Sequence, residues 1–172
     1  MSRLLTVTLG LILISAPAFA MSEKEFVSDA IKGDNSEIAV GQLALNNAGS
    51  EAARSLAQTL IDDHLQNRTQ AEAVASSLGV TPPSQPTAEA EQEMAKLSKL
   101  KGAEFDRAFA RYMVKDYEKD IAMFKSQAGN SPSPAQQLAS QSLPVLEKHL
   151  AMAKQLESAT ASETRTNGAK TP

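Results

Sequence analysis

Glycine and proline divide this chain into four long stretches, and within each stretch apolar residues recur at the spacing of an α-helix. Alanine, leucine, glutamine, glutamate and lysine dominate these stretches, and alternating β-branched residues are scarce. The two patterns together predict an all-α fold. We expect the long helices at about residues 23–47, 50–78, 103–128 and 135–158.

The second and third long stretches are joined by an unusually long connection. Three prolines make residues 80–87 a loop, and residues 88–100 are expected to form a short amphipathic helix that ends near Gly102. A connection of this length can carry the chain along a bundle, so that the second and third long helices run parallel. We therefore predict a ferritin-like, up-down four-helix bundle with a long crossover that contains a short extra helix.

Two positions are expected to disturb the long helices. Gly33 and Asp34 predict a kink in the first helix, because glycine weakens a helix interior. Pro144 predicts that the fourth helix is kinked or begins late, because proline removes a helical hydrogen bond.

The first twenty residues have the pattern of an export signal. Arg3 precedes an uncharged stretch, and Ala18-Phe19-Ala20 supplies the small-x-small pattern that signal peptidase cleaves. We expect residues 1–20 to be removed, which places the mature protein in the periplasm or outside the cell, without a transmembrane span.

The mature chain is expected to be one domain, residues 21–158, followed by a disordered tail, residues 159–172, that lacks apolar periodicity. The full chain has 17 basic and 20 acidic residues and a formal net charge of −3. Since no block of lysine and arginine is present, the composition argues against nucleic-acid binding. The absence of cysteine excludes disulfides and thiolate metal sites.

Each long helix carries an ionisable residue near the middle of its apolar face when its residues are placed at about 100° intervals. These residues are Glu37, His64, Asp116 and His149. All four lie near the midpoints of their helices, so a bundle brings them to a similar height. Because an unpaired buried charge costs several kcal/mol, we expect them to meet in one polar layer.

The sequence leaves two interpretations of this layer open. In the first, the four residues hold iron, manganese or zinc, with Tyr117 and Asp120 as secondary ligands. The Glu-x-x-His pair of di-iron carboxylate proteins is absent, because Ile61 and Leu146 stand three residues before the histidines. In the second, histidine–carboxylate hydrogen bonds fix the helix register without a ligand. The incomplete ligand set favours the second interpretation, so no cofactor is expected and a metal is the alternative.

Asp62 and Asp63 flank His64 at the edge of the apolar face and are expected to be solvated charges. A glycine-rich phosphate loop, a G-x-S-x-G elbow and an H-E-x-x-H helix are all absent, and no catalytic or cofactor-binding residue is predicted. We therefore expect a protein that binds an envelope partner or a small ligand, or supports the envelope structurally, rather than an enzyme. The partner and the oligomeric state are left open.

Four short blocks of the mature sequence resemble one known family. They lie at residues 37–44, at 60–64, at 104–106 together with 112–116, and at 143–150. Together they resemble the bacterial domain-of-unknown-function family 4142, whose members often carry the label of predicted outer membrane proteins. The resemblance spans nearly all of the mature chain and implies an exported, ferritin-like helical bundle without an established activity.

The same resemblance implies that Glu37, His64 and His149 occupy recurring polar positions of the family. Tyr117 stands where the family pattern usually has histidine after Asp116, which weakens the metal interpretation. A phenolate can bind ferric iron, but Tyr117 falls at the flank of the apolar face, where it can simply pack.

Overall fold

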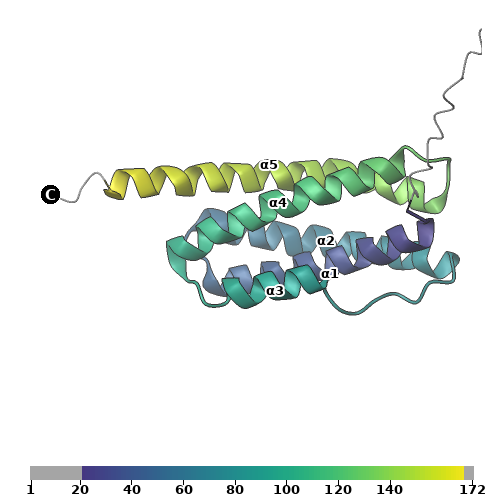
Figure 1. Ribbon diagram of the computed structural model, residues 1–172, viewed down its shortest axis with the longest axis horizontal. Coiled ribbons are helices and arrows are strands. Elements are labelled where there is room, and N and C mark those ends of the chain that lie inside the picture. Colours follow the sequence, from purple (N-terminus) through teal and green to yellow (C-terminus); the bar gives the residue numbers. More distant parts are fainter. Residues whose placement is uncertain (1–20, 169–172) are drawn as a thin grey trace, which may run out of the picture.

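The computed structural model describes residues 21–168, and the predicted signal peptide, residues 1–20, lies outside them (Figure 1). Within the described range the chain forms five α-helices and no β-strand, which confirms the all-α prediction. The helices are α1 (Glu23–Asn47), α2 (Glu51–Ser77), α3 (Ala88–Leu97), α4 (Gly102–Ala128) and α5 (Pro134–Gly168). No helix in this range is long and apolar enough to cross a membrane.

Two helical hairpins, α1–α2 and α4–α5, pack against each other to form the bundle (Figure 1). The crossover that joins them contains α3, which lies beside α1 on the outside of the bundle. Asp106 in the second turn of α4 accepts hydrogen bonds from the backbone N–H groups of Gly49 (2.9 Å) and Ser50 (2.8 Å) in the α1–α2 turn. Therefore α2 and α4 begin at the same end and run parallel, as the long connection predicts.

Local sequence signals set the helix ends. Ser22 and Glu25 form a capping box at the start of α1, and the Ser50 side chain caps α2. Gly79, which follows α2, and Gly102, where the crossover turns into α4, have φ values of 68° and 59°. Glycine adopts this left-handed conformation at little cost, so both turns follow directly from the sequence.

Close contact between α1 and α2 depends on Gly41. A Cβ atom at this position would lie 2.8 Å from Ile61 Cγ1 and 3.0 Å from the carbonyl oxygen of Ala57. Because these distances are shorter than van der Waals contact, only glycine allows the two helices to approach this closely. The interior on either side of the layer is apolar, with Phe26 and Phe105 fully buried.

Three features differ from the expected helix pattern. First, α1 runs without interruption through Gly33 and Asp34. Second, α5 begins at Pro134, so the late start expected from Pro144 is wrong, and the Pro144 side chain is exposed. Third, α5 continues to Gly168, so residues 159–168 are helical and not the expected disordered tail. Extending a helix that has already formed fixes only one further residue at a time, which explains this continuation. Residues 169–172 lie outside the described range.

Candidate functional site

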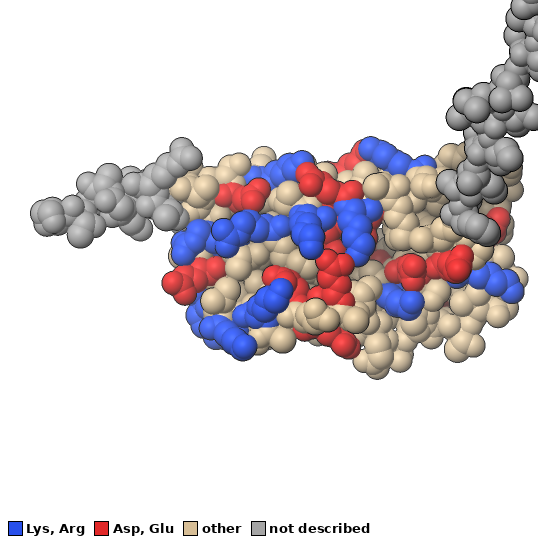
Figure 2. Space-filling model, in the orientation of Figure 1, with Lys and Arg blue, Asp and Glu red and all other residues tan. Residues whose placement is uncertain are grey.

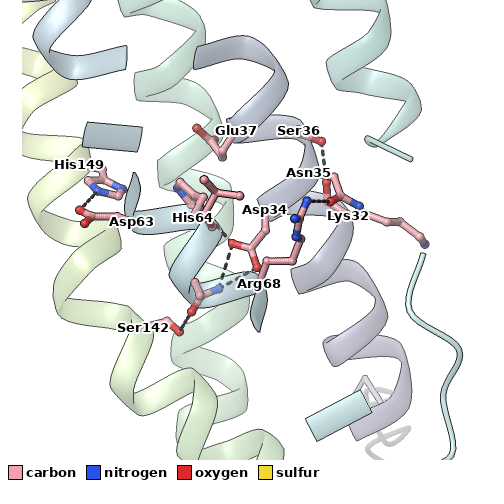
Figure 3. A network of polar contacts seen from close by, with 12 residues as sticks. Lys32, Asp34, Asn35, Ser36, Glu37, Asp63, His64, Arg68, Ser142 and His149 are labelled. Carbon is pink, nitrogen blue, oxygen red and sulfur yellow. Dashed lines mark hydrogen bonds and ion pairs between the residues drawn. The ribbon is translucent and has the colours of Figure 1, made fainter. Parts of the chain in front are cut away.

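The predicted polar layer lies at mid-height between the two hairpins, and Figure 3 shows its main side chains close together. Glu37, His64 and His149 are 1%, 4% and 0% exposed, and Asp116 is partly buried. The ring centroids of His64 and His149 are 5.2 Å apart. The structure therefore buries Glu37, His64 and His149 inside the bundle and leaves Asp116 partly exposed.

A series of hydrogen bonds, which we call the polar chain, crosses this layer and begins on α5 (Figure 3). The Ser142 hydroxyl donates to Asn67 Oδ1 at 2.6 Å, and the Asn67 amide donates to both carboxylate oxygens of Asp34 at 3.0 and 2.9 Å. His64 Nδ1 lies 2.8 Å from Asp34 Oδ1. Burial raises the pKa of Asp34, while hydrogen bonds from His64 and Asn67 favour its charged form. Asp34, Asn67 and Ser142 were not predicted as members of the layer.

The polar chain continues from His64 through Tyr117 to Glu37. His64 Nε2 lies 3.1 Å from the Tyr117 hydroxyl, and that hydroxyl donates to Glu37 Oε2 at 2.9 Å. Tyr117 is fully buried, so the flank of the apolar face, where the sequence places it, also faces the interior. Burial and the neighbouring Glu37 raise the pKa of Tyr117 well above its usual value, so Tyr117 is a neutral phenol.

Glu37, Asp116 and Asp120 form a second group, which we call the carboxylate cluster, where α1 meets α4. One oxygen atom from each carboxylate lies within 4.8 Å of the other two. Burial and the nearby Asp116 raise the pKa of Glu37 well above its usual value, and the same causes raise the pKa of Asp120 to about 7. Glu37 Oε1 is buried and accepts no hydrogen bond from a described donor, and the Asp116 carboxyl can share a hydrogen bond with Glu37 only when one of the two is protonated. Lys119 acts on Asp120 and lowers its pKa, but burial and Asp116 outweigh this effect, so the positive charge near the cluster compensates it only in part.

A cavity of about 430 Å³ opens beside the carboxylate cluster, between α1, α4 and the end of the loop before α3. Asp116 and Asp120 line it, together with Gly33 and Lys119. A cation with six water molecules, at about 30 Å³ each, needs roughly 180 Å³ and fits this space. On the face seen in Figure 2, acidic and basic side chains lie interspersed near mid-length, without a large patch of one sign.

The second histidine belongs to a separate pair at the interface of α2 and α5. His149 Nε2 lies 2.8 Å from Asp63 Oδ2, and Lys148 Nζ lies 3.2 Å from the same oxygen. Burial lowers the pKa of His149 to about 4, so the ring is neutral near pH 7 and donates to Asp63. Partial burial opposes ionisation of Asp63, but hydrogen bonds from His149 and Lys148 lower its pKa overall.

Asp63, expected to be a solvated charge, is only 30% exposed and pairs with His149. The structure also separates the predicted mixed ligand set. Both ring nitrogens of His64 are engaged by Asp34 and Tyr117, and neither histidine belongs to the carboxylate cluster. Asp120, predicted as a secondary ligand, lies within the cluster.

Comparison with known proteins gives a family and a shared fold. The family model described as Domain of unknown function (DUF4142) matches residues 14–156. No protein with a curated description matches the chain. A DUF305 fragment from Deinococcus radiodurans has a similar crystal structure, with a TM-score of 0.71, 21% identity, and coverage of 80% of this chain and 95% of that chain.

A second crystal structure, of the "putative secreted protein DUF305" from Streptomyces coelicolor, has a TM-score of 0.70 and 15% identity, and covers 81% of this chain and 93% of that chain. At these identities the two similarities establish a common fold only. The chemistry of this chain has to be inferred from its own side chains.

Proposed function

This chain belongs to the DUF4142 family, whose description names no function, and we propose from its side chains that it binds a hard divalent cation at the carboxylate cluster. Glu37 of α1 and Asp116 and Asp120 of α4 supply the ligands. The protein acts outside the cytoplasm as a binding protein, and no catalytic step is assigned to it.

The free oxygen of Glu37 is the observation that carries this proposal. A buried polar atom without a partner costs about 1–3 kcal/mol, and more when it is charged. Two further carboxylates beside Glu37 increase this cost, because like charges repel across a desolvated gap. A cation bound between the three groups removes both penalties and takes the place of the protons that the raised pKa values of Glu37 and Asp120 otherwise retain.

The donor atoms favour particular metals. All three ligands offer oxygen, and oxygen donors suit Mg²⁺, Ca²⁺ and Mn²⁺, whereas Zn²⁺ and copper prefer nitrogen and sulfur. Of the iron, manganese and zinc considered from the sequence, manganese fits this cluster best. His64 and His149 already have carboxylate partners, so their role in the proposal is structural.

Isothermal titration with MnCl₂ tests the proposal on the mature protein. We expect binding of one Mn²⁺ per chain, weakened by at least about tenfold in Glu37→Gln, Asp116→Asn and Asp120→Asn. Glu118→Gln is the matched control, because it removes the same charge from an exposed position of α4 that pairs with Lys154. Absence of Mn²⁺ binding to the wild type, or an equal loss in the control, contradicts the proposal.

The export part of the proposal rests on the pattern of residues 1–20. Expression of the full chain followed by cell fractionation is expected to place the protein in the periplasm or the medium, with an N-terminal sequence that begins at Met21. An intact Met1 on a cytoplasmic protein contradicts export.

A further inference from the structure

We infer that Tyr117 determines the cation specificity of the carboxylate cluster. By occupying one oxygen of Glu37, it selects small six-coordinate cations such as Mn²⁺ and Mg²⁺ over Ca²⁺. This inference rests on the proposed cation site and names the class of cation that the site accepts.

The two oxygens of Glu37 are not equally available to a ligand. Its Oε2 accepts the Tyr117 hydroxyl at 2.9 Å, and only Oε1 is without a partner. Since Oε2 shares its electron density with the Tyr117 hydroxyl and is held in one orientation by it, Oε2 is a weaker metal ligand than Oε1, and Glu37 favours binding a cation through Oε1 alone.

The rest of the polar chain holds Tyr117 in place. Its ring is fully buried, and its hydroxyl also contacts His64, whose other nitrogen is bound by Asp34. Asn67 in turn binds both oxygens of Asp34. Because Tyr117 of α4 is held by Glu37 of α1 and His64 of α2, it cannot rotate away from Glu37 without breaking contacts between the two hairpins. Outer hydrogen bonds of this kind orient metal ligands in proteins generally.

Cations respond differently to a carboxylate that favours binding through one oxygen. Ca²⁺ takes about 6–8 oxygen ligands and commonly uses a bidentate carboxylate, whereas Mg²⁺ requires about six in a regular octahedron and keeps several water molecules. One oxygen from each carboxylate of the cluster supplies three positions, and the cavity beside Asp116 and Asp120 has room for water at the others. The arrangement therefore suits a small octahedral cation and leaves Ca²⁺ short of ligands.

Tyr112 provides a matched control for Tyr117. It lies on the same helix, is 7% exposed, and its hydroxyl forms no hydrogen bond with any described residue. Burial raises the pKa of Tyr112, and so do the charges of Asp116 and Glu37. Tyr112 therefore lies near the same carboxylates as Tyr117. Tyr112→Phe thus removes an equivalent hydroxyl from α4 without freeing an oxygen of Glu37.

The test compares the ratio of the Ca²⁺ and Mn²⁺ dissociation constants, measured with CaCl₂ and MnCl₂, in the wild type, Tyr117→Phe and Tyr112→Phe. We expect the wild type and Tyr112→Phe to share a strong preference for Mn²⁺. In Tyr117→Phe the ratio is expected to fall by about tenfold or more, because Glu37 becomes able to bind Ca²⁺ through both oxygens. An unchanged ratio in Tyr117→Phe overturns the inference and leaves the proposed function standing. A wild type that binds no Mn²⁺ overturns the proposed function itself.

A spectroscopic measurement separates this role from a loss of packing. Pulsed EPR of the Mn²⁺ complex counts the water molecules on the metal, and we expect about one fewer in Tyr117→Phe than in Tyr112→Phe. Equal counts overturn the inference. If circular dichroism shows that Tyr117→Phe does not fold, His64→Gln replaces it, because this change loosens Tyr117 while keeping its hydroxyl. An intermediate fall in the ratio then supports the inference, and no fall overturns it.

Discussion

The α1–α4 interface and the α2–α5 interface both contain carboxylates near the polar layer, but they differ in whether these carboxylates are paired with basic residues. At the α2–α5 interface, Asp63 is matched by His149 and Lys148. At the α1–α4 interface, Glu37, Asp116 and Asp120 face one another, and no hydrogen bond or ion pair from a base to them is found among the described residues, since Lys119, which acts on Asp120, is bound by Glu89. A matched pair fixes which residues face each other across two helices, and it leaves little affinity for a further ion. An unmatched group of carboxylates weakens the empty protein and creates affinity for a cation.

The largest expected effect is on stability at the matched interface. His149→Ala removes a fully buried ring and its hydrogen bond, and we expect the free energy of unfolding to fall by about 3 kcal/mol in urea at pH 8. Mn²⁺ affinity is expected to stay within about twofold of the wild type, because His149 is outside the carboxylate cluster. A loss of affinity comparable to that of Glu37→Gln would show that the two interfaces do not act separately.

The second largest expected effect is a gain in stability, and it concerns Asp120 at the α1–α4 interface. Asp120 keeps its proton to about pH 7 in the folded protein, whereas the unfolded chain loses it near pH 3.8. The wild type without metal therefore loses stability as the pH rises from about 4 to 7, and the deficit persists above pH 7. Asp120→Asn removes this deficit, so we expect it to stabilise the metal-free protein by about 2 kcal/mol at pH 8.5.

Urea unfolding of Asp120→Asn at pH 4 and at pH 8.5, with EDTA present, checks this prediction. The stabilisation is expected to shrink to about 0.5 kcal/mol at pH 4, because the folded protein then holds the Asp120 proton and the unfolded chain is close to its own midpoint of pH 3.8. Glu118→Gln serves as the control and is expected to change stability little at either pH, because Glu118 is exposed. A stabilisation that is equal at both pH values would assign the effect to packing instead of charge.

Acid is expected to weaken the matched interface by a smaller amount. The pKa of His149 is about 4 in the folded protein and near 6.5 in the unfolded chain. The unfolded state thus binds the proton first, and stability falls as the pH drops from 6.5 toward 4. We expect the His149 contribution to this loss to be about 1–2 kcal/mol, and we expect it to be absent in His149→Gln. If the free energy of unfolding falls equally with decreasing pH in the wild type and in His149→Gln, the loss of stability does not come from His149.

The smallest effect concerns the rim of the cavity. Glu89 of α3 binds Lys115 and Lys119 at 3.0 and 2.8 Å, and these contacts lower its pKa to about 2. Glu89→Gln is expected to cost less than about 1 kcal/mol, because the pairs are exposed. It releases Lys119 toward Asp120, so Mn²⁺ affinity is expected to fall by about threefold. Unchanged affinity in a titration would show that Lys119 stays away from the cluster without Glu89.

Much of the fold was predictable from local chemistry. The caps at Ser50 and Gly79 and the prolines of the crossover define the long helices, and the length of the crossover predicts the parallel pair α2 and α4. The helical residues after Ser158 were not predictable from apolar periodicity, because an established helix can continue without it.

The polar layer was predictable in its members but not in its pairing. Helical spacing identifies Glu37, His64 and His149 as inward-facing. Asp34 carried the same signal, since it lies four residues after Ala30 and three before Glu37, but the preceding glycine suggested a helix break. The partners of His149 and Tyr117 depend on the register between helices that are distant in the sequence, which the periodicity of a single helix does not specify.

The long crossover also has a consequence for assembly. Each hairpin closes through a short turn and makes local contacts that can form early, whereas the polar chain needs both hairpins and is completed when they dock. The crossover is the sole covalent link between the hairpins. The α1–α2 hairpin of one molecule can therefore make the same contacts with the α4–α5 hairpin of a second molecule. Two molecules refolding at high concentration therefore have a route to an intertwined, domain-swapped dimer with two intact layers.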